Sequence, residues 1–184
     1  MNHQEFNLLY DDVFADPLSE LGFHPVGKTK SLRRISGTRD LWIKRIKGKW
    51  PHPGVARTAI CFRHRFLRPV SSDNPNSTNL MVDDFSRKLT FEDFDGWLKP
   101  RLRYRPENAG RWSTSDIDYG DRPPHQVEND LRKMRKVVEK RLLPWVNALT
   151  EDGELAQIIR SGEDAWCETR WIEDYRSFCR EKVN

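Results

Sequence analysis

At 184 residues, the chain is long enough for one well-filled core and too short to suggest two ordinary domains. Charged residues make up 33% of it, yet seven Trp, nine Phe and four Tyr supply large side chains to bury, which excludes a disordered protein. No stretch approaches the roughly 20 apolar residues of a membrane span, and the first residues lack the order of a secretory signal. We therefore expect a cytoplasmic protein that does not enter a membrane.

The net charge of +4 hides a segregation of charge along the chain. Residues 1–27 carry five acidic residues and no Lys or Arg, residues 28–111 carry 20 basic and 8 acidic residues, and residues 112–184 carry 12 and 15. The simplest arrangement that uses this segregation is a basic central sheet flanked by acidic helices.

The first third of the chain predicts a helix followed by strands. Residues 1–21 place apolar side chains three and four positions apart, which indicates an amphipathic helix that restarts at Pro17 and ends at Gly22. Residues 31–36 and 41–47 are typical of short strands joined by a turn at Gly37. Because no connection of helix length separates these strands from the next one, an antiparallel meander is expected.

The strand predicted for residues 55–69 has two different faces. Strand side chains alternate, so Ile60 and Phe62 point to one side, toward a core. The other side displays arginines, and residues 101–105 repeat the pattern, which gives two rows: Arg57, Arg63 and Arg65; Arg101, Arg103 and Arg105. Such rows require water, acidic side chains or an acidic partner.

The remaining elements complete an α+β fold in one domain covering residues 1–184. Composition predicts a loop at 71–84, a short helix at 90–98 and a strand at 111–114, so that residues 30–116 are mainly sheet. Residues 124–182 are expected to be helical: a long helix interrupted at Pro144, a short helix capped by Thr150 and a last helix capped by Ser161. The long helix carries a stripe to be buried, Val127, Leu131, Met134, Val138 and Leu142; the short helix runs through Leu155, Ile158 and Ile159; and the last helix carries Trp166, Cys167, Trp171, Tyr175 and Phe178. The predicted architecture is an antiparallel meander sheet packed against the N-terminal helix and the C-terminal helical segment.

One stretch matches a nucleotide-binding motif by its letters alone. Residues 22–29, GFHPVGKT, fit the pattern GxxxxGK[ST], in which a strand delivers a glycine-rich loop to the start of a helix that holds phosphate. Here a helix precedes the match and a basic strand is predicted after it. The reversed context argues against a phosphate-binding loop.

Other residue types that perform chemistry lack the spacing that chemistry needs. The cysteines, Cys61, Cys167 and Cys179, form no close pair, and His64 falls on the opposite strand face from Cys61, so a histidine of the core or its boundary is favoured over a metal ligand. Acidic residues that a magnesium-dependent nuclease would need are better explained by helix capping and salt bridges: Asp83, Asp84, Glu92, Asp93 and Asp95. We expect no cofactor, no metal and no catalytic residue.

The order of several short motifs resembles a bacterial family, the domain of unknown function 4304. These motifs are Leu21-Gly22-Phe23 after the first helix, Trp112 after the basic strands, and Leu143-Pro144 followed by Leu149-Thr150 in the helical tail. The resemblance spans about Phe6 to Ile159. It implies a small α+β protein without an assigned activity, and some members look like immunity proteins encoded beside toxins.

The arginine rows allow three interpretations. Acidic helices cover and neutralise them, an acidic protein partner binds them, or they bind nucleic acid with Trp112 stacking on a base. From the segregated charge and the resemblance, the sequence predicts a non-catalytic protein-binding protein, an immunity protein that neutralises a toxin by occlusion. The alternative is a nucleic-acid-binding module that uses a basic sheet face. The residues expected to contact either partner are Arg57, Arg63, Arg65, Arg101, Arg103, Arg105 and Trp112.

Overall fold

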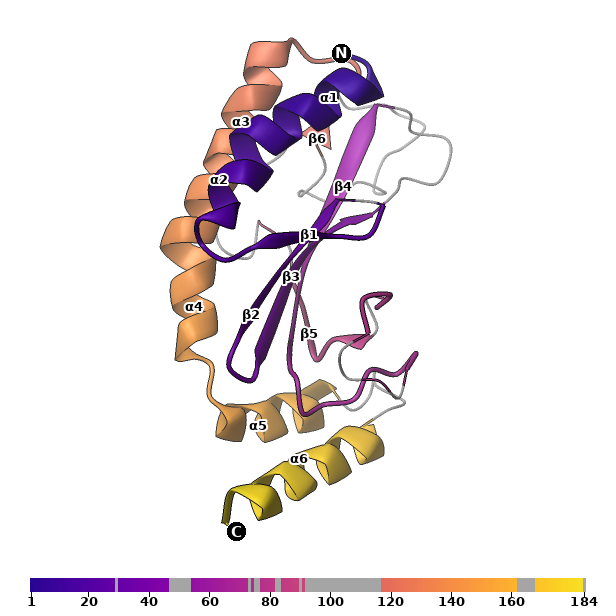
Figure 1. The fold of residues 1–184 in the computed structure, drawn as a ribbon, viewed down its shortest axis with the longest axis vertical. Coiled ribbons are helices and arrows are strands. Elements are labelled where there is room, and N and C mark those ends of the chain that lie inside the picture. The colour runs from indigo at the N-terminus through magenta and orange to yellow at the C-terminus, as the bar shows by residue number, and fades with distance from the viewer. Residues whose placement is uncertain are drawn as a thin grey trace.

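The fold is known from a computed structural model that describes residues 1–28, 30–46, 54–72, 74, 77–81, 84–89, 91, 117–161 and 168–183. The chain has an α+β architecture in which helices precede and follow an antiparallel sheet. In Figure 1, α1, α2, α3 and α4 lie along one side of the sheet, and α5 and α6 lie beyond one end of it.

The N-terminal helical segment forms as predicted and supplies much of the core. It consists of α1 (His3–Tyr10), the π-helical turn η1 (Asp11–Ala15) and α2 (Asp16–Ser19). Asn2 and Glu5 form a capping box at its start, and Gly22 ends it with a φ of +82°, a conformation that glycine adopts without strain. Its apolar stripe is buried: Phe6, Tyr10, Val13, Phe14 and Leu18.

The sheet is the predicted antiparallel meander. Its strands are β1 (His24–Val26), β2 (Ser31–Ser36), β3 (Arg39–Ile46), β4 (Val55–His64) and β5 (Arg87–Leu89), paired in that order. The observed β2 matches the prediction, and β3 begins two residues earlier than predicted. Ile60 faces Ile43 and Phe62 faces Leu41 across the β3–β4 ladder, so the apolar sides of the two strands coincide.

β4 is shorter than the strand predicted for residues 55–69, because the chain turns after His64. The Leu67 amide donates back to the His64 carbonyl at 3.0 Å, and the Arg65 amide donates to the Thr38 carbonyl at 2.6 Å. The Arg65 bond is the next step of the β3–β4 register, and the Leu67 bond closes a turn, so the chain leaves the sheet after Arg65. The prediction of one continuous strand to Pro69 was therefore wrong.

A short strand that the sequence did not reveal, β6 (Ile117–Asp118), pairs with the start of β4. The junction depends on two glycines, because a Cβ added to Gly54 would lie 2.8 Å from the Gly120 Cα. Gly54 also has a φ of +87°. Its carbonyl accepts hydrogen bonds from the amides of Tyr119 and Gly120. Two residues with one apolar side chain give too little periodicity to predict a strand.

The long C-terminal helical run consists of α3 (Pro124–Val137), the π-helical turn η5 (Val138–Leu142) and α4 (Leu143–Ala148). Its predicted stripe is buried as expected: Val127, Leu131, Met134, Val138 and Leu142. A proline in the interior of a helix usually ends or kinks it. Pro144 does not end this run, because it lies in the first turn of α4, directly after η5.

The last two helices are α5 (Glu151–Ser161) and α6 (Glu168–Val183). Thr150 caps α5 as predicted, accepting from the Gly153 amide at 3.2 Å, but Ser161 is the last residue of α5 and does not begin the next helix. Of the predicted stripe of α5, Ile158 is fully buried as expected, but Ile159 is 57% exposed, and the fully buried Glu154 takes a place in the covered face.

The main core lies between the helices and one face of the sheet. Residues of α1, η1 and α3 pack there against the apolar residues of β2, β3 and β4. The opposite sheet face carries a smaller cluster of Trp42 and Cys61 with Leu80 and Phe85 of the segment after β4. A third cluster joins Leu67, Ile158 of α5 and Trp171 of α6. The C-terminal helices thus pack on a cluster of their own.

Several predicted elements lie outside the described residues. These are the greater part of the helix at 90–98 and the strands at 101–105 and 111–114. Trp166 and Cys167, assigned to the last helix, also lie outside them.

Replacing Gly54 by Ala tests the β4–β6 junction. The new Cβ meets the backbone of Gly120 in a left-handed backbone conformation, so we expect a loss of about 2 to 4 kcal/mol in the free energy of unfolding, measured by urea denaturation. Gly37→Ala is the matched control, because Gly37 also has a positive φ but has no atom within 4 Å of an added Cβ, and it should lose about 1 kcal/mol. Equal losses for the two variants would contradict the close approach.

Candidate functional site

The charged residues of the sheet meet inside the protein around one carboxylate, that of Asp40. Arg63 lies directly opposite Asp40 in the β3–β4 ladder, and its Nη2 donates to Asp40 Oδ2 at 3.1 Å. Arg33 of β2 donates from Nε to Oδ1 at 2.8 Å and from Nη2 to Oδ2 at 2.9 Å, which is the bidentate arrangement that makes Arg–carboxylate pairs strong. Asp40 and Arg63 are completely buried.

Trp42 completes this charge cluster. Its Nε1 donates to Asp40 Oδ1 at 2.7 Å, and the Arg33 guanidinium lies 4.9 Å from the centre of its ring. The Lys44 ammonium lies 5.2 Å from the same ring and donates to the Leu80 carbonyl. Burial lowers the pKa of Lys44 and of Arg63, whereas Asp40 raises that of Arg63.

This geometry corrects the predicted role of Arg63, which cannot contact a partner at the surface because it is 0% exposed. The arginine is neutralised from within the sheet by Asp40 of the adjacent strand, not by the acidic helices. Arg57 and Arg65 are half-buried and make interactions of their own. The other residues predicted to bind a partner lie outside the described part of the chain: Arg101, Arg103, Arg105 and Trp112.

Of the carboxylates considered for magnesium, the structure describes only that of Asp84, and Asp84 has a structural role. Asp84 is buried and accepts from the Ser71 amide at 2.6 Å, the Ser71 hydroxyl at 2.6 Å and the Met81 amide at 2.5 Å, so it fastens the segment after β4 over the sheet. Asp83, Glu92, Asp93 and Asp95 lie outside the described residues. Among the residues described, no group of three or more His, Cys, Asp or Glu is arranged to hold a metal ion.

The described residues that match the phosphate-loop pattern form β1 and the turn that leads into β2. After Gly22 the chain enters β1, turns at Gly27 with a φ of +68°, and continues into β2. Thr29, the last letter of the pattern, lies outside the described residues. A strand follows the pattern where the motif needs the N-terminus of a helix.

A second polar cluster surrounds His64 at the end of β4. His64 Nδ1 lies 3.1 Å from the Thr38 hydroxyl, which donates to Glu151 Oε1 at 2.8 Å. On the other side of the ring, Nε2 lies 3.5 Å from Glu154 Oε2, and Arg87 Nε lies 3.9 Å from the same oxygen. Strand, turn and α5 therefore meet at one imidazole.

Burial controls the protonation of this cluster. It lowers the pKa of His64 to about 4, an effect that Glu151 opposes and that Arg39, Arg87 and Lys182 reinforce. Burial also raises the pKa of Glu154, with Ser86 and Arg87 opposing it. The Thr38 hydroxyl lowers the pKa of Glu151. A hydroxyl, an imidazole and a carboxylate in series are the residue types of nucleophilic catalysis, but His64 and Glu154 are 0% exposed, so no substrate reaches the base.

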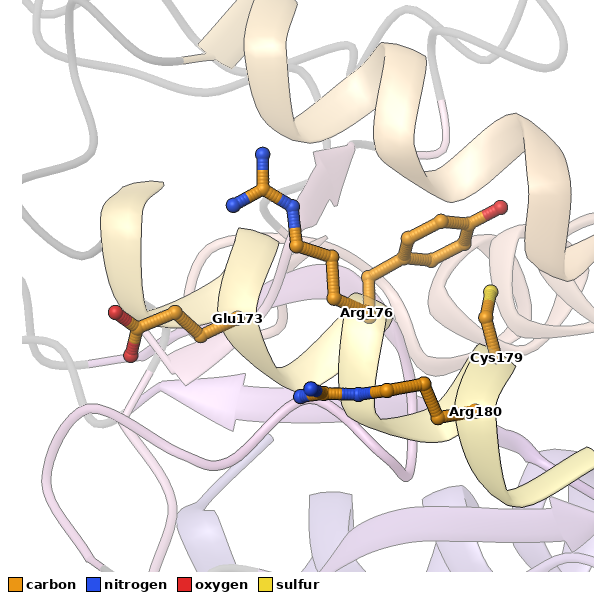
Figure 2. A pocket seen from close by; sticks show the side chains of 5 residues that line it. Glu173, Arg176, Cys179 and Arg180 are labelled. Atoms are coloured by element: carbon orange, nitrogen blue, oxygen red, sulfur yellow. The ribbon is translucent and has the colours of Figure 1, made fainter.

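An open groove of about 490 Å³ runs along α6 at the far end of the molecule (Figure 2). The residues described along it are Glu173, Tyr175, Arg176, Cys179 and Arg180. Figure 2 shows Arg176 and Arg180 extending from successive turns of the helix. Tyr175 donates from its hydroxyl to Asp152 at 3.3 Å, and Cys179, followed by burial, raises the pKa of Tyr175 to about 12. Sequence reasoning missed this groove, because it assigned Tyr175 and Cys179 no role in binding and did not consider Arg176 and Arg180.

α6 is held on the segment after β4 rather than over the arginine face. Arg68 donates from Nε to Asp174 Oδ1 at 2.6 Å and from its amide to Oδ2 at 2.8 Å. Trp171 Nε1 donates to the Arg68 carbonyl at 2.8 Å, and the rings of Phe66 and Phe178 stack with centroids 4.2 Å apart. These contacts leave the Arg176 and Arg180 side of the helix open.

Comparison of the chain with protein-family models, with curated proteins and with solved structures gave no match. The resemblance to the domain of unknown function 4304 therefore stays a prediction. None of the helices in the described ranges is both long enough and apolar enough to cross a membrane.

Removing the charge of Asp40 tests the cluster of β2, β3 and β4. Asp40→Asn leaves the buried Arg63 without its counter-charge, so we expect a loss of about 3 to 5 kcal/mol in the free energy of unfolding, measured by urea denaturation. Asp11→Asn breaks the partly exposed pair with Lys30 and should lose at most about 1 kcal/mol.

The second arm of this experiment changes Arg63 to Met. Because the Arg33–Asp40 pair remains, this variant should lose less than Asp40→Asn, and the double variant should lose less than the sum of the two single losses. Strictly additive losses would show that Asp40 and Arg63 do not act as a pair.

Proposed function

We propose that this chain is a non-catalytic protein-binding protein of the cytoplasm, which acts as an immunity protein does, by occluding the surface of an acidic toxin. The observation that carries the proposal is the open groove on α6, where Arg176 and Arg180 are exposed one turn apart beside Tyr175. Arginine and tyrosine are enriched at the centre of protein interfaces, where they combine apolar contact with hydrogen bonding.

The charges of the groove favour an acidic partner. Neither Arg176 nor Arg180 forms an ion pair with a residue of the described ranges, whereas Arg68 and Lys182, which hold the C-terminal helices in place, both do. A carboxylate of a partner that reaches both guanidinium groups would form charge-assisted hydrogen bonds without breaking an existing pair. The groove also includes Glu173, which disfavours a continuous phosphate backbone and favours a protein surface of mixed polarity.

The interior of the sheet supports the same choice. Nucleic-acid binding by a basic sheet face needs exposed cations, and Arg63 and Arg33 are instead buried around Asp40. The imidazole of His64 is sealed from solvent, so the one series of catalytic residue types in the described ranges lies out of reach of a substrate. The exposed arginines of α6, in contrast, are available to a partner.

Reversing the charges of the groove tests the proposal. We expect the tagged protein, copurified from its native host, to retain one acidic protein in stoichiometric amount, and we expect Arg176→Glu with Arg180→Glu to weaken that binding at least tenfold, because like charges then meet across the interface. Affinity is measured by calorimetry with the purified partner.

Lys136→Glu with Lys140→Glu is the matched control. It makes the same change in net charge at exposed positions of α3 and η5, along the sheet and away from α6, and should bind as the parent does. Equal weakening by both pairs would show a general charge effect and contradict a site on α6. Retention of nucleic acid alone would overturn the proposal in favour of a nucleic-acid-binding module.

A further inference from the structure

The hydrogen bonds around His64 fix where its proton lies. Glu151 is a carboxylate that only accepts, since the pKa of its side chain is lowered, so the Thr38 hydroxyl donates to it at 2.8 Å. The Thr38 oxygen therefore accepts from His64, and Nδ1 carries a hydrogen. In a neutral ring this leaves a lone pair on Nε2.

That lone pair faces an acid. Nε2 lies 3.5 Å from Glu154 Oε2, at the outer limit of hydrogen-bond distance, and has no hydrogen-bond partner among the described residues. Both groups are fully buried. An ionised carboxylate that faces a lone pair at a fully buried position would be repelled by it, so the arrangement favours one proton between the two atoms.

We propose that α5 is fastened to the end of the sheet by one proton shared between His64 Nε2 and Glu154 Oε2, and that loss of this proton as the pH rises loosens α5 and α6 together. The proton can affect the docking of α5 because few other contacts hold this helix on the sheet. Besides this pair, α5 contacts the sheet end through polar groups, Glu151 with Thr38 and both Glu154 and Gln157 with Arg87, and Ile158 of α5 packs in the small cluster with Leu67 and Trp171.

The surrounding charges set the pH range over which the proton is held. Charged groups face the pair from β3, β5, α5 and α6: Arg39, Arg87, Glu151 and Lys182. The rings of Phe62 and Phe66 pack against the His64 ring, and Trp145 lies against Phe62 and Arg87. Arg87 favours ionised Glu154, but burial is the larger effect and raises the pKa of that carboxyl. The pair therefore holds its proton to a higher pH than an exposed glutamate does.

The two directions of pH change have different consequences. Because the pKa of Glu154 is raised on folding, the folded chain binds more protons, and stability falls as the pH rises through the folded pKa. Because the pKa of His64 is lowered to about 4, stability also falls as the pH drops from about 6.5 toward that value, when the ring gains a second proton and with it a buried positive charge. The attachment is strongest between these two limits.

Hydrogen exchange of the full chain tests this inference. Protection of the α5 amides, corrected for the intrinsic pH dependence of exchange, should fall by up to about tenfold per pH unit as the pH rises toward the raised pKa of the pair and should level off above it, while protection in β3 and β4 stays unchanged. In Glu154→Gln the amide N–H takes the place of the proton, so α5 should remain protected at alkaline pH. Glu181→Gln, at an exposed site on α6, should behave as the parent.

Nitrogen chemical shifts of His64 provide a second measurement that does not depend on any variant. The expected result at neutral pH is a ring with a proton on Nδ1, and a neutral ring with its only proton on Nε2 would overturn the inference. So would protection of α5 that is independent of pH in the parent protein. The readout requires no partner, so failure of the groove on α6 as a binding site would leave this result unaffected, and the reverse also holds.

Discussion

The carboxylate of Asp40 is the group on which the remainder of the structure depends. Two arginines that occupy one sheet face would be intolerable in a dry interior without it. With its charge neutralised, Arg63 also donates from Nη1 to the Leu67 carbonyl at 2.6 Å, which fixes the turn that ends β4. Residues 66–70 are then placed to receive Trp171 and Asp174 of α6. One buried acid thus determines, through a buried base, where the last helix lies.

The elements with strong periodicity were predictable, and the pairing between them was not. The stripe of α3 and the alternation of β4 follow from local sequence, because a helix or strand buries side chains at fixed spacing. That Asp40 lies opposite Arg63 depends on the register of two strands whose connection includes residues 47–53, and no local pattern sets it. Charge segregation pointed to distant helices, whereas the acid was in the neighbouring strand.

The same reason explains the partial success at His64. Its alternation with Ile60 and Phe62 placed it on the core side of β4, as observed, and a core histidine was favoured over a metal ligand. Its partner Glu154 was not assigned, because the stripe of α5 was predicted through Leu155, Ile158 and Ile159, of which only Ile158 lies on the fully buried face that Glu154 shares. The signal for Glu154 in the sequence is an acidic residue four positions before Ile158, on the same side of a helix, since acidic residues are seldom fully buried without a partner.

The two ends of the molecule are held by different forces, and this affects binding. The helices along the sheet bury a large apolar cluster, whereas α5 and α6 are held by a small cluster and by directional polar contacts, so their local opening should require less free energy than opening of the sheet. A partner that binds only docked α6 must stabilise the docked state. By thermodynamic linkage it would then raise the affinity of the His64–Glu154 pair for its proton by the same factor by which that proton favours the partner. The groove and the buried pair are therefore coupled wherever both operate, although neither depends on the other to exist.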